Sequence, residues 1–123
     1  MIALDTSVLI EAVGAGGAMR AELRKVIAGG ERVVLPSIVL YEWLRSPRLT
    51  EELDAQSVLF PSSEAIPFGA NEARIAAQLY RSVRRPRGRE LDLAIAACAL
   101  SWNAALWTLN RGDFDDVPGL RLS

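Results

Sequence analysis

Short apolar runs, each bounded by polar residues, glycine or proline, alternate along the chain with longer stretches of helical periodicity. Such runs are typical of buried strands. They predict strands at Met1–Leu4, Arg32–Leu35, Ala65–Phe68, Ala105–Leu109 and Leu120–Leu122. The third strand is expected at an edge of the sheet, because Pro67 has no backbone N–H to donate.

The stretches between these runs place apolar residues at three- and four-residue intervals, as on one face of a helix. They predict helices at Val8–Val13, Ala18–Ala28, Ile38–Leu44, Leu49–Leu59, Ala70–Val83 and Glu90–Trp102. Thr6 or Ser7 is expected to cap the first helix and Ser37 the third. Strands that alternate with helices predict a three-layer α/β fold, with a mostly parallel central sheet of four or five short strands.

No repeat, low-complexity tract or linker divides the 123 residues, so a single domain over residues 1–123 is expected. Apolar residues make up 50% of the chain, which is enough for a sizeable core. The chain opens without a basic segment, and no apolar stretch approaches the ~20 residues that span a bilayer. We therefore expect a soluble, cytoplasmic protein without a membrane partner.

Missing residue types exclude several kinds of chemistry. The chain has no histidine and a single cysteine, Cys98, which excludes Ser-His-Asp and Cys-His catalysis and an intrachain disulfide. The usual zinc ligands are missing for the same reason. Cys98 lies in an apolar stretch and is expected to be a small buried side chain. Carboxylates remain, and their oxygen atoms suit Mg²⁺ or Mn²⁺.

Four acidic residues stand near element boundaries: Asp5, Glu42, Asp92 and Asp113. In a parallel α/β sheet, the carboxyl ends of the strands and the starts of the following helices meet at one edge. Asp5, Asp92 and Asp113 are expected there, and Glu42 can reach over from its helix. Carboxylates packed together repel one another unless a divalent cation neutralises them. The pattern indicates a metal-dependent enzyme that acts on phosphates.

Each acid also has an ordinary structural explanation, which the sequence leaves open. Asp5 can cap the helix that follows, although an ionised group after a buried strand is costly without a positive partner. Glu42 can pair with Arg45 on the surface of its helix. Asp92 can compensate the helix dipole, and Asp113 can be an ordinary turn residue. The joint placement of the four favours a site.

The acids lie in segments that resemble the motifs of the PIN-domain family, in particular the VapC-like toxins of type II toxin–antitoxin pairs. The motifs keep the family's order and span Ile2 to about Leu122. They are Leu4-Asp-Thr-Ser-Val8, Ser37-Ile-Val-Leu-Tyr-Glu42, Asp92-Leu-Ala-Ile-Ala-Ala97, and Trp107-Thr-Leu-Asn110 with Asp113-Phe114. The resemblance implies a PIN-like fold and an Mg²⁺- or Mn²⁺-dependent ribonuclease with a site of three or four acids.

The resemblance also implies roles for individual residues. Asp5 and Asp92 are expected as the principal metal ligands, and Glu42 as a third acid that acts directly or through water. In some relatives the fourth acid stands where this chain has Asn110, and in others where it has Asp113. Both positions therefore stay open.

Two hydroxyl residues and the partners follow from the same resemblance. Thr6 resembles the family's hydroxyl that hydrogen-bonds the first acid, and Ser7 replaces a commoner asparagine. The protein is expected to be a toxin that cleaves tRNA or ribosomal RNA, opposed by a small antitoxin whose C-terminal segment covers the acids. A homodimer is also implied, with residues 18–28 and 70–83 as candidate surfaces.

Four arginines precede the helix that carries Asp92: Arg84, Arg85, Arg87 and Arg89. The net charge of the chain is −1, so binding of nucleic acid requires a local basic patch instead of an overall positive field. This loop can grip RNA phosphates, pair with acids of a partner protein, or be solvated. The sequence alone does not distinguish among these three roles of the loop.

Two other functions remain as alternatives to the metal-dependent ribonuclease. A catalytically silent PIN fold can bind RNA or a protein without turnover, and metal-dependent cleavage would exclude it. A phosphate-ester hydrolase of the haloacid-dehalogenase type also uses an aspartate after its first strand. That family needs a second aspartate two residues further on, where this chain has Ser7.

Overall fold

Three parallel strands form the sheet of the computed structural model, which describes residues 1–123. β1 (Ile2–Leu4) lies in the centre, with β2 (Val33–Val34) on one side and β3 (Ala105–Trp107) on the other. All three residues of β1 are buried, which explains why this strand is wholly apolar. The register pairs Ile2 with Val33 and Ala105, Ala3 with Val34 and Leu106, and Leu4 with Trp107.

Two isolated parallel bridges continue the sheet at its edges. Ile66 pairs with Pro36 beyond β2, and Leu122 pairs with Leu106 of β3. These are the places where the sequence predicts two further strands. The parallel α/β sheet is therefore confirmed, with three strands instead of four or five. Pro67 limits the edge at Ile66, because it has no N–H to extend the pairing.

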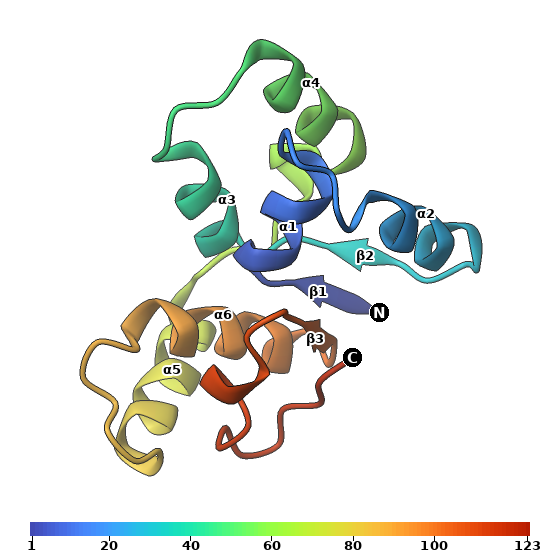
Figure 1. The fold of residues 1–123 in the computed structure, drawn as a ribbon. Coiled ribbons are helices and arrows are strands. Elements are labelled where there is room, and N and C mark those ends of the chain that lie inside the picture. Colours follow the sequence, from blue (N-terminus) through green and yellow to red (C-terminus); the bar gives the residue numbers. More distant parts are fainter.

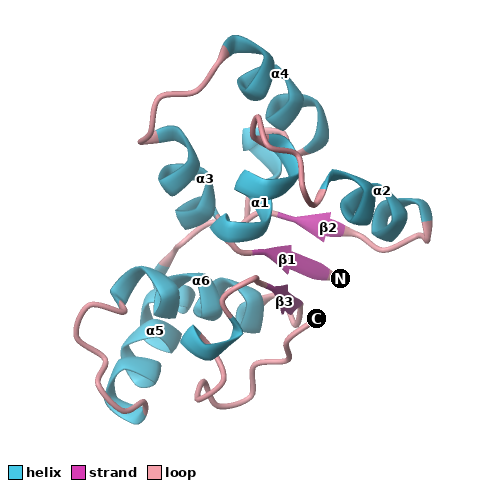
Figure 2. Ribbon diagram, in the orientation of Figure 1, coloured by secondary structure: helices cyan, strands magenta, loops and turns pink.

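Six helices flank the sheet. They are α1 (Thr6–Val13), α2 (Arg20–Ala28), α3 (Ser37–Leu44), α4 (Thr50–Leu59), α5 (Ala70–Ser82) and α6 (Glu90–Ser101). Short 3₁₀ turns cover Ser62–Glu64 and Arg111–Asp113. The helices α1 to α4 gather around β1 and β2, whereas α5 and α6 lie on the β3 side, so the sheet runs between two groups of helices (Figure 1, Figure 2).

The residues at two helix starts differ from those expected. Asp5 occupies the N-cap position of α1 and Pro36 that of α3, and neither makes a side-chain capping bond. The predicted caps Thr6, Ser7 and Ser37 are instead the first residues inside these helices. The prediction was wrong at α1 because the hydroxyls of Thr6 and Ser7 donate to the carboxylates of Glu42 and Asp5 instead of accepting a backbone N–H of the first helical turn.

The core is centred on β1, β3 and α6. Seven consecutive residues of α6, Leu93 to Ala99, are buried, and four of them are alanines that let neighbouring elements approach closely. Cys98 is among them, and burial raises the pKa of its thiol to about 12, which confirms it as a small core side chain. The longest helix, α5, has 13 residues, and no helix has the length and apolarity of a membrane span.

Helix α3 connects the two groups of helices, because it packs against α1 on one side and α6 on the other. Its position brings residues from three distant parts of the chain to the carboxyl ends of β1 and β3. The start of α1, the end of α3 and the start of α6 therefore surround one polar region of the surface.

Candidate functional site

Asp5 is a buried carboxylate at the end of β1, with 4% of its surface exposed. Its backbone N–H donates to the Trp107 carbonyl of β3, which fixes the residue at the edge of the sheet. The hydroxyls of Ser7 and Thr108 both donate to Oδ2, at 2.9 and 2.7 Å. No basic side chain pairs with Asp5, and its second oxygen, Oδ1, has no protein donor. The side chain is thus held in one orientation with an oxygen free for a ligand.

The same two hydroxyls tie the segment after β3 to Asp5. Ser7 Oγ accepts the backbone N–H of Leu109 at 3.0 Å, and Thr108 Oγ1 accepts that of Asn110 at 2.9 Å. Thr108 is 4% exposed and was not among the residues singled out from the sequence. Thr108 stands in the motif segment Trp107-Thr-Leu-Asn110, but its bond to Asp5 becomes evident only once β3 is paired with β1.

Glu42 comes to the site from the last turn of α3. Thr6 Oγ1 donates to its Oε1 at 2.6 Å, and Arg45 Nη2 lies 3.5 Å from its Oε2. The prediction that Thr6 bonds the first acid was wrong: Ser7 donates to Asp5, and Thr6 donates to Glu42 because its side chain lies toward α3. The surface pair of Glu42 with Arg45, expected as its structural explanation, is also present, and Glu42 lines the pocket as well.

Asp92 lies in the first turn of α6 and lines the same region as Asp5 and Glu42. Burial raises the pKa of its carboxyl to about 6, and the negative charges of Asp5, Asp113 and Glu42 add to the effect. Arg89 acts in the opposite direction but does not cancel it. The acids are therefore close enough to repel one another; Glu42 pairs with Arg45, but no basic side chain forms an ion pair with Asp5 or Asp92.

A polar pocket of about 370 Å³ contains these groups. Its lining has one hydrophobic residue in ten: Asp5, Thr6, Ser7, Ile10, Glu42, Arg45, Ser46, Arg48, Asp92 and Asn110. Seven of these ten belong to the motif segments identified in the sequence or to their flanks. Arg45, Ser46 and Arg48, which follow α3, were not expected as part of a site.

The two candidates for the fourth acidic position lie differently. Asn110 lines the pocket, whereas Asp113 lies outside its lining, in the 3₁₀ turn Arg111–Asp113. The charge of Asp113 still raises the pKa of Asp92. Asn110 therefore shares the pocket lining with the three acids, and Asp113 acts on Asp92 through its charge.

The donor set fits a hard divalent cation. No three acidic side chains are grouped closely enough to hold a metal ion as they stand. Mg²⁺ needs only one or two direct carboxylates, because it keeps several of its waters. Asp5 offers an oxygen without a donor, and Asp92 has a raised pKa that a nearby cation would lower. These two residues suit direct ligation, with Glu42 close to them in the pocket.

The basic loop before α6 does not line this pocket. Arg89 donates to both oxygens of Asp116, at 2.6 and 3.0 Å, and to the carbonyls of Arg84 and Asp113. This pairing raises the pKa of Arg89 and lowers that of Asp116. Arg89 thus fastens the C-terminal segment, while Arg84, Arg85 and Arg87 are exposed.

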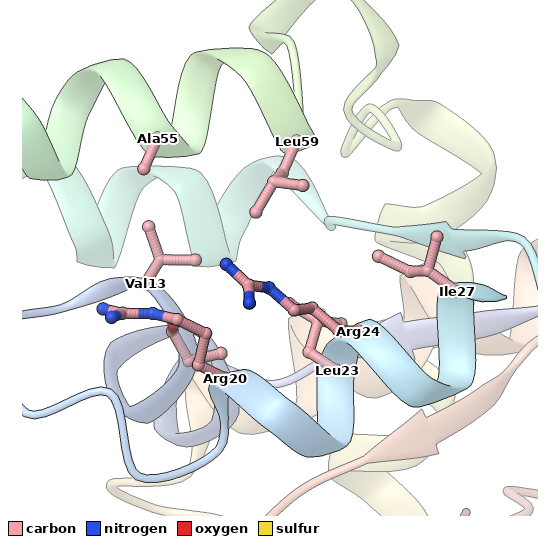
Figure 3. Close-up of a pocket in the computed structure, with 8 residues that line it drawn as sticks. Val13, Arg20, Leu23, Arg24, Ile27, Ala55 and Leu59 are labelled. Atoms are coloured by element: carbon pink, nitrogen blue, oxygen red, sulfur yellow. The ribbon is translucent and has the colours of Figure 1, made fainter.

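A second cavity, of about 280 Å³, lies between α1, α2 and α4 (Figure 3). Val13 and Leu23 meet Ala55 and Leu59 across it, and Arg24 reaches into the space between the helices (Figure 3). Its lining has six hydrophobic residues in eight and no carboxylate. This cavity is separate from the acids, and its lining suits apolar contacts but has no group for acid or metal catalysis.

The parallel sheet and the pocket at its edge define an α/β domain whose candidate site is built from carboxylates. A family model described as the PIN domain matches residues 2–120. The chain therefore belongs to the PIN domain family, a family of nucleases, which confirms the resemblance seen in its motifs.

Solved structures from toxin–antitoxin pairs share this fold over essentially the whole chain. VapBC2 of Rickettsia felis, solved with a DNA fragment from its promoter, is 22% identical, with a TM-score of 0.73 and coverage of 100% of this chain and 98% of that one. VapBC-1 of nontypeable Haemophilus influenzae is 25% identical, with a TM-score of 0.71 and coverage of 100% and 97%. VapBC-5 of Mycobacterium tuberculosis, from the VapBC family of toxin–antitoxin systems, is 24% identical, with a TM-score of 0.58 and coverage of 98% and 97%. No curated protein sequence matches the chain.

Proposed function

We propose that this protein is a metal-dependent endoribonuclease and the toxin of a VapBC-like type II toxin–antitoxin pair. The observation that carries the proposal is the convergence of Asp5, Glu42 and Asp92 on one polar pocket, in which neither Asp5 nor Asp92 forms an ion pair. Membership of the PIN family and the fold shared with VapBC structures support it. The substrate class is structured RNA such as tRNA or ribosomal RNA.

The residues of the chain have separate tasks in this reaction. Mg²⁺ or Mn²⁺, when bound, supplies an activated water and neutralises charge on the phosphate. Asp5 and Asp92 hold the cation, and the hydroxyls of Ser7 and Thr108 keep Asp5 in its orientation. Thr6 holds Glu42 at 2.6 Å, so that its carboxylate faces the same pocket.

The partners proposed are a cognate antitoxin and a second copy of the chain. The antitoxin's C-terminal segment covers the acid pocket and blocks the RNA. Helices α2 and α5 are the candidate surfaces of a homodimer. Both carry exposed apolar side chains, with Ile27 and Tyr80 each 40% exposed, and α2 also lines the apolar cavity of Figure 3. A cytoplasmic location goes with this role.

The test is incubation of the purified, antitoxin-free protein with total RNA in Mg²⁺, in Mn²⁺ and in EDTA. Discrete fragments are expected with metal and none in EDTA. Asp5→Asn is expected to abolish cleavage, and Asp115→Asn, which changes an exposed acid without partners, is the matched control. Cleavage by Asp5→Asn at the wild-type rate would refute the site.

A catalytically silent PIN fold that binds RNA or a protein is the second candidate. The observation in its favour is Asn110, an uncharged residue that lines the pocket where some relatives have the fourth acid. The two candidates give opposite results in the same assay. Metal-dependent fragments exclude the silent fold, and a folded protein that leaves RNA intact in both metals favours it.

A further inference from the structure

Arg48 is a cation of the acid pocket that has no anionic partner in the protein. It is partly buried and lines the pocket together with Arg45 and Ser46. The ion pairs of the structure involve the N-terminus, Arg45 and Arg89, but not Arg48. A partly desolvated guanidinium normally pairs with an anion or with several hydrogen-bond acceptors. Because Arg48 has no anion within the protein, we expect an anionic ligand to bind it.

The guanidinium of Arg48 is held in place without using its outer donors. Its central carbon lies 3.9 Å from the centroid of the Trp43 ring, and Nε donates to the Trp43 carbonyl at 3.0 Å. Trp43 is fully buried, so the ring is a fixed support for the stacked cation. Both terminal amino groups, Nη1 and Nη2, make no hydrogen bond to the protein. A fork of two such groups matches the oxygens of a phosphate.

The other arginines near the acids are already engaged. Arg45 pairs with Glu42 and lies over the Tyr41 ring, and Arg89 spends both of its amino groups on Asp116 and two carbonyls. The remaining loop arginines do not line the pocket. Among the arginines that line the pocket, Arg48 is thus the one without a carboxylate partner.

We propose that Arg48 binds a backbone phosphate of the RNA strand next to the bond that faces the acids. The proposal rests on the nuclease function given above and names the residue that holds its substrate. A pocket of carboxylates repels a phosphodiester, and the chain as a whole has a net charge of −1. A fixed guanidinium at the pocket wall offsets this repulsion and sets the register of the strand.

The test measures binding of a short, fluorescently labelled single-stranded RNA by anisotropy, in EDTA so that no strand is cut. Arg48→Gln is expected to weaken binding about tenfold and to reduce the slope of log K against log salt by about 0.7, the value for one phosphate contact on a single strand. Arg74→Gln is the matched control, because Arg74 is an exposed arginine outside the pocket whose loss changes the net charge equally. It is expected to leave the slope unchanged.

Arg48→Lys separates charge from geometry, since lysine keeps the charge but loses the planar fork. It is expected to weaken binding about threefold to fivefold with a wild-type salt slope. If Arg48→Gln unfolds because the stack on Trp43 is lost, Arg48→Lys decides alone. Wild-type affinity in the folded variant would overturn the proposal, as would an Arg48→Gln slope equal to that of Arg74→Gln.

Cleavage in Mg²⁺ gives a second readout. A phosphate-binding residue raises KM for RNA more than it lowers kcat, whereas a residue that only supports the fold lowers the amount of active protein. Wild-type protein that binds RNA but never cuts it would refute the nuclease function and leave the binding test of Arg48 valid. Wild-type protein that binds no RNA would overturn both.

Discussion

At the scale of the residue, Asp5 shows how a buried carboxylate can be stabilised without a basic partner. No base pairs with it, and two hydroxyls from different elements donate to one of its oxygens. Hydrogen bonds to an ionised carboxylate are stronger than those between neutral groups. They hold the carboxylate in one orientation while one oxygen stays available. Thr108 matters as much to this arrangement as the motif residue Ser7.

Thr108→Val tests that view, because valine keeps the shape and removes only the hydroxyl. The change leaves Asp5 with one donor fewer and the backbone N–H of Asn110 without its acceptor. We expect a loss of about 1–3 kcal/mol in the free energy of unfolding and a lower rate of RNA cleavage. Urea unfolding measures the first and fragment formation the second. Thr50→Val, at the exposed start of α4, is the control and is expected to change stability by no more than about 0.5 kcal/mol.

The raised pKa of Asp92 makes the metal-free protein sensitive to pH. The pKa of Asp92, at which half of the carboxyl groups are ionised, is 3.8 in the unfolded chain and about 6 in the folded one. Between these values the folded state binds more protons, so stability contributed by Asp92 falls as pH rises from about 4 to 6. Above 6 that stability is fully lost.

Asp92→Asn removes this sensitivity. In EDTA at pH 7 we expect the variant to be more stable than wild type by about 1 kcal/mol, after allowance for solvent screening of the half-buried carboxyl. The melting temperatures should converge below about pH 3, where wild-type Asp92 is protonated in both states. Asp115→Asn is the control. A gain that is the same at both pH values would show that repulsion of Asp92 is not its cause.

At the scale of the element, the pattern of apolar residues located every helix to within two residues, both where one face is apolar, as in α5, and where the apolar run is nearly continuous, as in α6. The central strand was also predictable, since β1 is buried at all three positions. The edges of the sheet were not predicted correctly. Residues 65–68 and 120–122 are as apolar as the residues of a strand, but each segment forms a single bridge. Pairing at an edge depends on the neighbouring backbone, which apolar patterning does not report.

The loop before α6 has two parts with different tasks. Arg89 joins the start of α6 to Asp116, and this partly buried bidentate pair orders the C-terminal segment. We expect Arg89→Gln to lower the free energy of unfolding by about 0.5–1.5 kcal/mol. Thermal melting is the measurement, and Arg87→Gln, which removes an exposed arginine of the same loop, is the control.

The exposed arginines of that loop carry the remaining proposal of an RNA-binding rim. Replacing Arg84, Arg85 and Arg87 together by serine is expected to weaken RNA binding and reduce its salt dependence, with little change in melting temperature. Anisotropy titrations at several salt concentrations measure both. A salt slope equal to that of wild type would mean that the loop is only a solvated surface.

At the scale of the whole molecule, the site depends on contacts between parts of the chain that are far apart. Motif residues could be predicted as site members, because Asp5, Glu42 and Asp92 follow a pattern along the sequence. The place of Arg48 in the pocket lining could not be predicted, since Arg48 follows α3 and comes to the pocket only because α3 packs against both α1 and α6. Thr108 was not predicted as a site residue because its bond to Asp5 also depends on a contact between distant parts of the chain, the pairing of β3 with β1.

Metal binding is the prediction that involves the molecule as a whole, because a cation held by Asp5 and Asp92 links the end of β1 to the start of α6. A ligand that binds only the folded state raises its stability by RT ln(1 + [L]/Kd), about 2.7 kcal/mol at a hundred times Kd. We therefore expect Mn²⁺ or Mg²⁺ to raise the melting temperature of wild type and of Asp115→Asn. Asp5→Asn and Asp92→Asn should lose this effect even where their own melting temperatures in EDTA differ from wild type. An equal rise in all four proteins would place the cation elsewhere, and with it the proposed centre of the reaction.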